Sequence, residues 1–211
     1  MSKKKKKTLN KKNISQHQNI SKKKPFVNYG IIPKITNIVS TAYLGCKLDL
    51  NKIASHYKEA KLSERFDRIT LKINNPKTTA FICSNGKLIC LGAKSEEDSL
   101  KACKEYCNII KNLNFGVKFS GFEIQNIVGS YDVKFKIPLS DLRKNILIKN
   151  HCNYEPEIFP GLIYHPECEA NITLSVFSSG KIIISGGKKT QQIYDELNKF
   201  YPFLIKYNNW K

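Results

Sequence analysis

An internal repeat is the feature that most constrains what this chain can fold into. The tripeptide Asn37–Val39 recurs as Asn126–Val128, and the segment Ser84–Lys94 (SNGKLICLGAK) recurs as Ser178–Lys188 (SSGKIIISGGK). The two matches come in the same order, at offsets of 89 and 94 residues. Such self-similarity indicates a tandem duplication of one structural unit. The sequence thus predicts three parts: a disordered Lys-rich tail over residues 1–30, a first repeat over 31–121 and a second repeat over 122–211.

The periodicity of the first copy predicts antiparallel strands. In Phe66–Asn74, apolar residues alternate with polar and basic ones, as in a strand with one apolar face and one basic face. Two further β-rich runs, Thr78–Ser84 and Lys87–Ala93, are joined around Asn85-Gly86, a dipeptide typical of hairpin turns. A short helix is expected near Leu50–Tyr57, with a counterpart in the second copy.

A long amphipathic helix is predicted at the end of each copy. The first begins at Ser95 with a sequence similar to a capping box, and the second follows Thr190. Apolar side chains at helical spacing form one stripe on each helix: Leu100, Cys103, Cys107 and Ile110 on the first, and Ile193, Leu197, Phe200 and Leu204 on the second. Because both stripes must be buried on one face of the sheet, the opposite face, with its Thr, Lys and apolar side chains, is left as a binding surface.

The net charge of +19 points to a polyanionic partner, such as nucleic acid, an anionic membrane or an acidic protein. Ten lysines and no acidic residue stand in the first 24 residues, and removing these ten charges leaves +9 on the rest of the chain. The body of the protein is therefore basic in its own right. The lysine runs of the tail fit a nuclear address, a phosphate-seeking arm or the codon bias of an AT-rich genome.

No arrangement of residues points to catalysis or to a cofactor. The seven cysteines form no Cys-x-x-Cys pair, so we expect reduced, mostly buried thiols in an intracellular protein rather than a zinc site. The four histidines are far apart in the sequence, and neither a G-x-S-x-G elbow nor a P-loop is present. The chain has no signal peptide and no apolar run long enough for a membrane span. We therefore expect no enzyme activity, no metal or other cofactor, no small-molecule substrate and no membrane partner.

Four segments of the chain resemble the TATA-box-binding protein family. They are NIVSTAYLGCKLDL (Asn37–Leu50), TTAFICSNGKLICLGAKSEEDS (Thr78–Ser99), FEIQNIVGSYDVKF (Phe122–Phe135) and YEPEIFPGLIY (Tyr154–Tyr164). The resemblance runs from about Ile31 to the C-terminus. It implies an α+β saddle with pseudo-two-fold symmetry, in which a curved antiparallel sheet of about ten strands carries helices on its convex face and DNA under its concave face.

The resemblance also assigns DNA-binding roles to individual residues. The family uses amides that donate to A·T acceptors, aliphatic side chains against the groove floor, phenylalanines that open base steps, and cations that contact phosphates. The matching residues are Asn37 and Asn126 for the amides, Val39, Val128, Ile89 and Ile183 for the aliphatics, Phe66, Phe159 and Phe177 for the wedges, and Lys72, Lys87, Lys94, Lys181 and Lys188 for the cations. Thr79 and Thr173 are placed on the same DNA-binding face.

This sequence departs from the family's pattern at several positions of that face. Cys83 stands at the place of the fourth wedge phenylalanine, and Phe81, two residues earlier on the same strand face, is expected to substitute in part. Leu91 replaces a threonine that hydrogen-bonds the groove, while its repeat partner is Ser185. Ser175 replaces a leucine of the second repeat. These changes predict a divergent relative with an altered preference for the usual TATA sequence.

A partner site is implied by the segment that contains Glu155, Glu157 and Ile158. It matches the loop that docks transcription factor IIB, and two acidic residues on a basic protein suit a basic partner. The resemblance thus implies a general initiation factor that binds and bends A·T-rich promoter duplexes and nucleates preinitiation complex assembly. Its expected protein partners are factors similar to transcription factors IIB and IIA and the RNA polymerase machinery.

Two other readings stay open from the sequence alone. One is a related interaction protein that sequesters transcription factors and has weak or altered DNA binding. The other is a saddle-like domain taken from a nucleic-acid enzyme, which is disfavoured because both repeats are complete and nothing catalytic is appended. The expected compartment is the nucleus, or a viral cytoplasmic factory or virion if the source is a large DNA virus.

Overall fold

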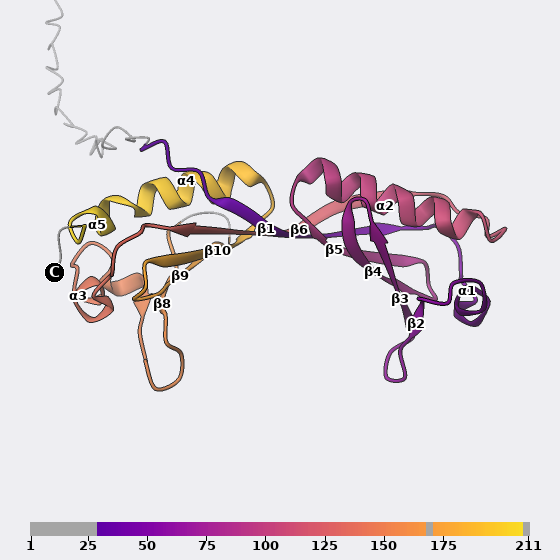
Figure 1. Cartoon of the computed structure of the whole chain (residues 1–211), viewed down its shortest axis with the longest axis horizontal. Helices are drawn as coiled ribbons and strands as arrows, with labels where there is room; N and C mark the ends of the chain where they lie inside the picture. Colours follow the sequence, from indigo (N-terminus) through magenta and orange to yellow (C-terminus); the bar gives the residue numbers. More distant parts are fainter. Residues whose placement is uncertain (1–28, 168–170, 209–211) are drawn as a thin grey trace, which may run out of the picture.

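Ten strands form one antiparallel sheet in the computed structural model of the protein, which describes residues 29–167 and 171–208. The strands of the first half are β1 (Lys34–Tyr43), β2 (Lys61–Leu62), β3 (Arg68–Asn74), β4 (Lys77–Cys83) and β5 (Lys87–Ala93). Those of the second half are β6 (Ser120–Asp132), β7 (Cys152–Asn153), β8 (Leu162–Tyr164), β9 (Thr173–Val176) and β10 (Lys181–Gly187). The strand order is β2-β3-β4-β5-β1-β6-β10-β9-β8-β7. Each half repeats the other outward from the centre, so the predicted ten-strand saddle is confirmed (Figure 1).

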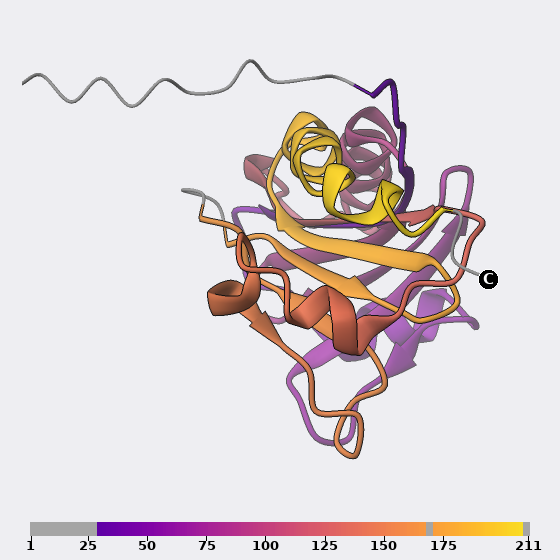
Figure 2. The ribbon, with the colours of Figure 1, turned by 90° about the vertical axis from the view of Figure 1, so that its left-hand side faces the viewer.

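The two long helices lie on the same face of this sheet. They are α2 (Glu96–Lys111) and α4 (Thr190–Phe200), and α5 (Pro202–Ile205) follows α4 directly (Figures 1 and 2). The short helices are α1 (Leu50–His56) and α3 (Leu139–Arg143), followed by the 3₁₀ turn η1 (Lys149–His151). Within the described part of the chain, no helix is both long and apolar enough to span a bilayer.

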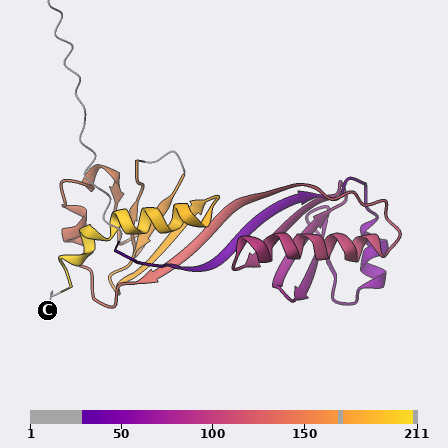
Figure 3. The same cartoon turned by 90° about the horizontal axis from the view of Figure 1, so that it is seen from above.

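The two halves are joined where β1 and β6 run side by side across the middle of the molecule (Figure 3). Ile38 pairs with Ile127 at the centre of this ladder, and both side chains are 0% exposed. On either side of that pair, Asn37 lies opposite Val128 and Val39 opposite Asn126. The repeated Asn-Ile-Val tripeptide therefore pairs with its own copy across the pseudo-two-fold axis.

Alternation along the outer strands separates a buried face from an open one, as the sequence predicts. In β3, Ile69 and Leu71 are buried beneath the helices, while Arg68 and Thr70 are half-buried and Lys72 is exposed. The predicted start of this strand is wrong, because β3 begins at Arg68. Phe66 instead belongs to the preceding loop, where its amide hydrogen-bonds the Ser63 hydroxyl at 3.2 Å rather than a neighbouring strand.

The helix stripes are confirmed except at one residue. Ser95 caps α2 by accepting a hydrogen bond from the Asp98 amide at 3.0 Å, as its sequence predicts. Cys103, Cys107 and Ile110 are buried, but Leu100 is half-buried. The helix turns Ser99 toward the sheet instead, where its hydroxyl lies 2.7 Å from that of Ser40, and this rotates Leu100 off the buried face. All four predicted residues of α4 and α5 are buried.

Each half has its own apolar core between the sheet and its helices. The core of the second half also takes in Ile31, which precedes β1 in the chain. That segment is fixed by Asn198 on α4, whose Oδ1 accepts from the Tyr29 amide at 3.2 Å and whose Nδ2 donates to the Ile31 carbonyl at 3.0 Å. The boundary predicted between residues 121 and 122 falls inside β6 and stays a prediction.

Two sequence predictions concern residues that lie partly outside the described ranges. The Lys-rich tail is outside them up to residue 28, and so is Cys168. The other six cysteines are free. Three of them, Cys90, Cys103 and Cys107, are buried and three are half-buried, so burial is less complete than predicted.

The central isoleucine pair makes a stability prediction. Replacing Ile127 by Ala should lower the free energy of unfolding by about 2–5 kcal/mol, because the truncated side chain leaves a cavity under the central ladder. The matched control is Ile146→Ala, since Ile146 is 75% exposed and its loss should cost less than about 0.5 kcal/mol. Urea unfolding followed by circular dichroism measures both, and equal losses would contradict a core centred on this ladder.

Candidate nucleic-acid interface

The sheet face opposite α2 and α4 is open, and we call it the concave face. Two loops descend on this side, one between β2 and β3 and one between β7 and β8 (Figure 1). Seen end-on, the sheet lies between the helices and these loops (Figure 2). A ligand the size of a DNA duplex would therefore meet a curved sheet with a loop projecting from each end.

The structure brings the residues predicted to bind DNA together on the concave face. All of them are half-buried or exposed, and each one that lies in a strand is next to a buried residue. Cross-strand pairs join them into one surface: Val39 with Leu91, Leu91 with Thr79, Thr79 with Lys72, Phe81 with Ile89, Ile183 with Ser175, and Ser185 with Thr173. Asn37, Asn126 and Val128 lie at its centre, Cys83 and Lys87 toward the first end, Lys181 toward the second, and Lys94 and Lys188 just after β5 and β10.

Two asparagine amides near the axis are held in one orientation by the backbone. The Gly92 amide donates to Asn37 Oδ1, and the Gly186 amide donates to Asn126 Oδ1, each at 2.8 Å. Both glycines have positive φ, +105° and +98°, which a side chain would strain. Because each Asn oxygen is occupied, each Nδ2 group is left as a donor. The centre of the concave face thus presents two symmetry-related donors beside two valines.

The second end of the face carries an aromatic pair. The rings of Phe159 and Phe177 meet edge to face with centroids 5.8 Å apart, and Phe159 is 36% exposed. Gly161 makes room for them, since a Cβ there would lie 2.7 Å from the Phe159 ring and 3.1 Å from the Phe177 ring. This end can therefore offer a preformed apolar wedge to a stack of bases.

The first end is built differently. Phe66 is 58% exposed, and Phe81 projects from β4 on the same side as Cys83, as their spacing predicts. The guanidinium of Arg68 lies 4.6 Å from the Phe66 ring centroid and 4.3 Å from that of Phe81. Arg68 belongs to the polar and basic face predicted for this strand, but it is not among the predicted DNA-binding residues. Alternation with Thr70 and Lys72 was the signal that could have identified it.

Charge on the concave face differs between the halves. Lys188 forms an ion pair with Glu123 at 2.7 Å, and this lysine, helped by a hydrogen bond from Gln125, holds the pKa of the Glu123 carboxyl below its usual range. Glu123 follows Lys34 by 89 residues, the offset that relates the two Asn-Ile-Val tripeptides. The first half therefore has a lysine where the second half has this acid. The acid therefore competes for one predicted phosphate-binding lysine, a feature that sequence analysis missed.

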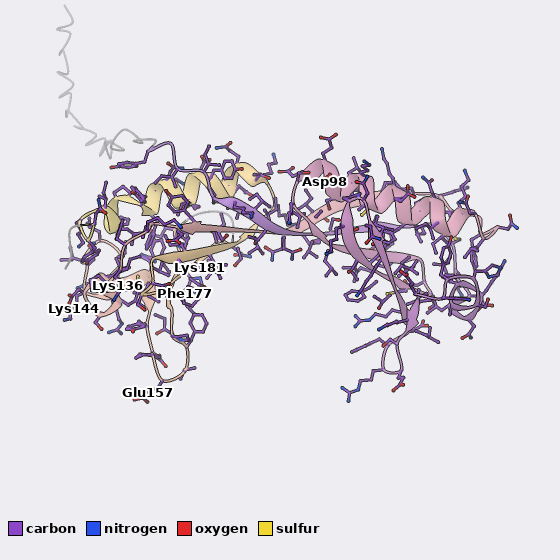
Figure 4. All side chains as sticks on the ribbon, viewed as in Figure 1. Asp98, Lys136, Lys144, Glu157, Phe177 and Lys181 are labelled. Atoms are coloured by element: carbon purple, nitrogen blue, oxygen red, sulfur yellow. The ribbon has the colours of Figure 1, made fainter. Side chains whose placement is uncertain are left out.

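The loop between β7 and β8 carries the predicted partner residues. Figure 4 shows Glu157 at its tip, with Phe177 and Lys181 nearer the sheet on the same side. A turn holds the loop, because the Ile158 and Phe159 amides donate to the Glu155 carbonyl at 3.0 and 2.9 Å. Glu155 and Glu157 are exposed, and Ile158 is 80% exposed. An exposed aliphatic side chain that directly follows two exposed acids is suited to contact with another protein.

Comparisons with known proteins agree with this geometry. The family described as "Transcription factor TFIID (or TATA-binding protein, TBP)" matches residues 32–113 and 121–207. The chain is 49% identical over 182 residues to the TATA-box-binding protein of Drosophila melanogaster, a match that covers 84% of this chain and 50% of that protein. It is likewise 49% identical over 180 residues to the TATA-box-binding protein of Acanthamoeba castellanii, covering 84% and 68%. The chain thus spans about half the length of the Drosophila relative.

A solved structure has the same fold. The Methanococcus jannaschii TBP aligns with a TM-score of 0.71 and 28% sequence identity, over 83% of this chain and 99% of that one. Almost all of the Methanococcus jannaschii chain therefore has a structural counterpart here.

Proposed function

Since this chain belongs to the TATA-box-binding protein family, we propose that it is a general transcription initiation factor that binds and bends A·T-rich promoter DNA through the minor groove. The observation that carries the proposal is the pair of oriented Asn37 and Asn126 amides at the centre of an open, basic, partly apolar face. A DNA-binding role without enzymatic activity is consistent with the family. The eukaryotic relatives favour a nuclear site of action.

The central donors suit the chemistry of the minor groove. There A·T pairs in either direction present acceptors, N3 of adenine and O2 of thymine, whereas a G·C pair adds the guanine 2-amino donor. The Nδ2 groups of Asn37 and Asn126, oriented by backbone hydrogen bonds to the side-chain oxygens, can donate to these acceptors but cannot pair with the guanine amino donor. Val39 and Val128 lie directly opposite these amides and would meet a guanine amino group without a hydrogen-bonding partner. The centre of the site is therefore selective for A·T over G·C, and tolerant of A·T in either direction.

The ends of the face supply the means of bending. Insertion of apolar side chains between base steps, with kinking toward the major groove, is an established property of this family. Phe159 and Phe177 are already paired and partly exposed, so they need little ordering on binding. The lysines around the face would then hold the phosphates of the bent duplex without reading sequence.

Sequence preference is expected to differ from that of the family's usual members. Cys83 cannot wedge as a phenylalanine does, and Leu91, in place of a groove-bonding threonine, offers no hydroxyl to the bases. Ser175 lies opposite Ile183 and Ile163, so the second half has a small polar side chain amid aliphatic ones. We therefore propose that A·T-rich composition is required but that the usual TATA order is read less strictly.

The loop between β7 and β8 is proposed as a docking site for a factor similar to transcription factor IIB, as part of preinitiation complex assembly. Its support is the exposed Glu155, Glu157 and Ile158 at a distance from the sheet, where bound DNA would leave them accessible (Figure 4). A factor similar to transcription factor IIA and the polymerase machinery complete the proposed partners.

The first test of the proposal uses base-pair chemistry. The protein should bind A·T-rich and I·C-substituted duplexes alike, because inosine lacks the 2-amino group, and each central G·C pair should cost about 1–3 kcal/mol. Affinity should also fall steeply as salt rises, because bound phosphates release counterions. Fluorescence anisotropy titrations at several salt concentrations measure both. Equal binding of A·T and G·C duplexes, or a flat salt dependence, would refute minor-groove binding, and retained binding of initiation factors would then favour the sequestering protein.

The second prediction concerns the aromatic pair. Phe159→Ala with Phe177→Ala should abolish the kink at one end of the site, because no apolar wedge would remain there. Energy transfer between dyes on the two duplex ends measures bending under saturating protein. Ile205→Ala is the matched control, since Ile205 is a partly exposed aliphatic residue on α5, away from the concave face. Unchanged transfer in the double variant would remove the wedge assignment.

The third prediction separates partner binding from DNA binding. Glu155→Arg should leave DNA affinity within about twofold, because a rim charge far from the groove contributes little, yet it should abolish the supershift by a transcription factor IIB-type protein. Glu105→Arg reverses an exposed acid on the outer surface of α2 and should change neither. A supershift that survives Glu155→Arg would show that the loop is not the docking site.

A further inference from the structure

An arginine occupies the end of the concave face where the second wedge phenylalanine of the first repeat would be expected. Arg68 is the first residue of β3 and pairs in register with Cys83, the residue that stands in the wedge position. Its guanidinium stacks near the rings of Phe66 and Phe81, with centroid distances of 4.6 and 4.3 Å. Three side chains thus form one cluster, which we call the arginine cluster, at this end of the face.

The cluster leaves a hydrogen-bond donor unused. Arg68 Nε is buried and is the one such side-chain nitrogen or oxygen without a partner among the described residues. No ion pair of Arg68 is present in the described part of the chain either. An unpaired buried donor is costly, and a guanidinium near two rings, with no carboxylate to neutralise it, keeps its charge available to a ligand. The first end therefore holds a cation that the folded chain itself does not satisfy.

The second repeat shows what the arginine replaces. Phe66 and Phe159 are the equivalent loop phenylalanines, so two residues further on Arg68 corresponds to Gly161, and Cys83 corresponds to Phe177. At the second end a bare glycine leaves space for the Phe177 ring. At the first end the ring is missing and the long arginine side chain lies in its region instead. The first end thus has a long charged side chain where the second has a glycine, and a small thiol where the second has a phenylalanine ring.

We propose that Arg68 is a DNA-contacting residue that takes the place of the missing wedge and donates to acceptors of the minor groove at the first end of the site. This rests on the proposed function of the concave face. Arginine is the side chain most often drawn to the negative potential of A·T-rich minor grooves, and its planar fork donates to base-edge oxygens and nitrogens. Stacking on Phe66 and Phe81 presents the fork already oriented, which reduces the ordering cost of binding.

Arg68→Met tests this directly, because it keeps the packing of the alkyl chain and removes the charge and the donors. Affinity for an A·T-rich duplex should fall roughly tenfold, and the slope of log affinity against log salt should become shallower by about one. Lys101→Met, on the exposed surface of α2, is the matched control and should change neither quantity. Thermal unfolding of each variant separates loss of binding from loss of fold.

A second variant tests whether the arginine substitutes for the wedge. Adding Cys83→Phe to Arg68→Met should recover most of the lost affinity through an apolar wedge, while the salt slope stays shallow because no cation returns. If Arg68→Met binds the duplex more weakly but its salt slope is unchanged, Arg68 merely supports the two rings, and the proposal is overturned. Unchanged affinity would overturn it as well. If the unaltered protein binds none of the duplexes, the proposed function fails first, and this inference fails with it.

Discussion

The pairing of β1 with β6 is the constraint on which the rest of the molecule depends. Ile38 and Ile127 meet at its centre with no exposure, and a shift of one residue in either strand would replace an isoleucine of this buried pair by its Asn or Val neighbour and turn that isoleucine to the open face. The same register puts Asn37 and Asn126 on the opposite face, where the side-chain oxygen of each accepts a hydrogen bond from the glycine amide that orients it. One interaction therefore fixes both the junction of the two halves and the spacing of the central donors.

Much of this was predictable because repeats and strand alternation are local properties of a sequence. The Asn-Ile-Val tripeptides and the Gly-Lys segments predicted two copies of one unit, and the alternation in Phe66–Asn74 predicted which side chains of this strand face away from the core. Family resemblance added the saddle and its curvature, which no periodicity contains. The orientation of the asparagine amides could not be predicted, because it depends on Gly92 and Gly186, which lie 55 and 60 residues away in the chain.

One of the predictions that failed, and several residues whose roles were missed, share one cause. Leu100 fits the helical spacing, yet contact between Ser99 and Ser40 decides how the helix is turned. Ile31 precedes the first strand but packs in the core of the second half, next to a residue on α4. Arg68 and Glu123 acquire their roles from rings and from a lysine on other strands. In each case a partner distant in sequence overrides the local pattern.

Because the backbones of the two repeats are nearly symmetric, the side chains that differ between the repeats matter for function. A surface with perfect two-fold symmetry would bind a duplex equally well in both directions, so any preferred direction must come from residues that differ between the repeats. The first end has Arg68 and Cys83 where the second has Gly161 and Phe177, and the second half has an acid beside Lys188 where the first has Lys34. With the roles proposed for these residues, the second end would favour deep apolar insertion and the first would favour a groove of negative potential. Because an easily unstacked step and an A·T-rich step are different sequences, a promoter that offers one at each end would be bound in a single direction.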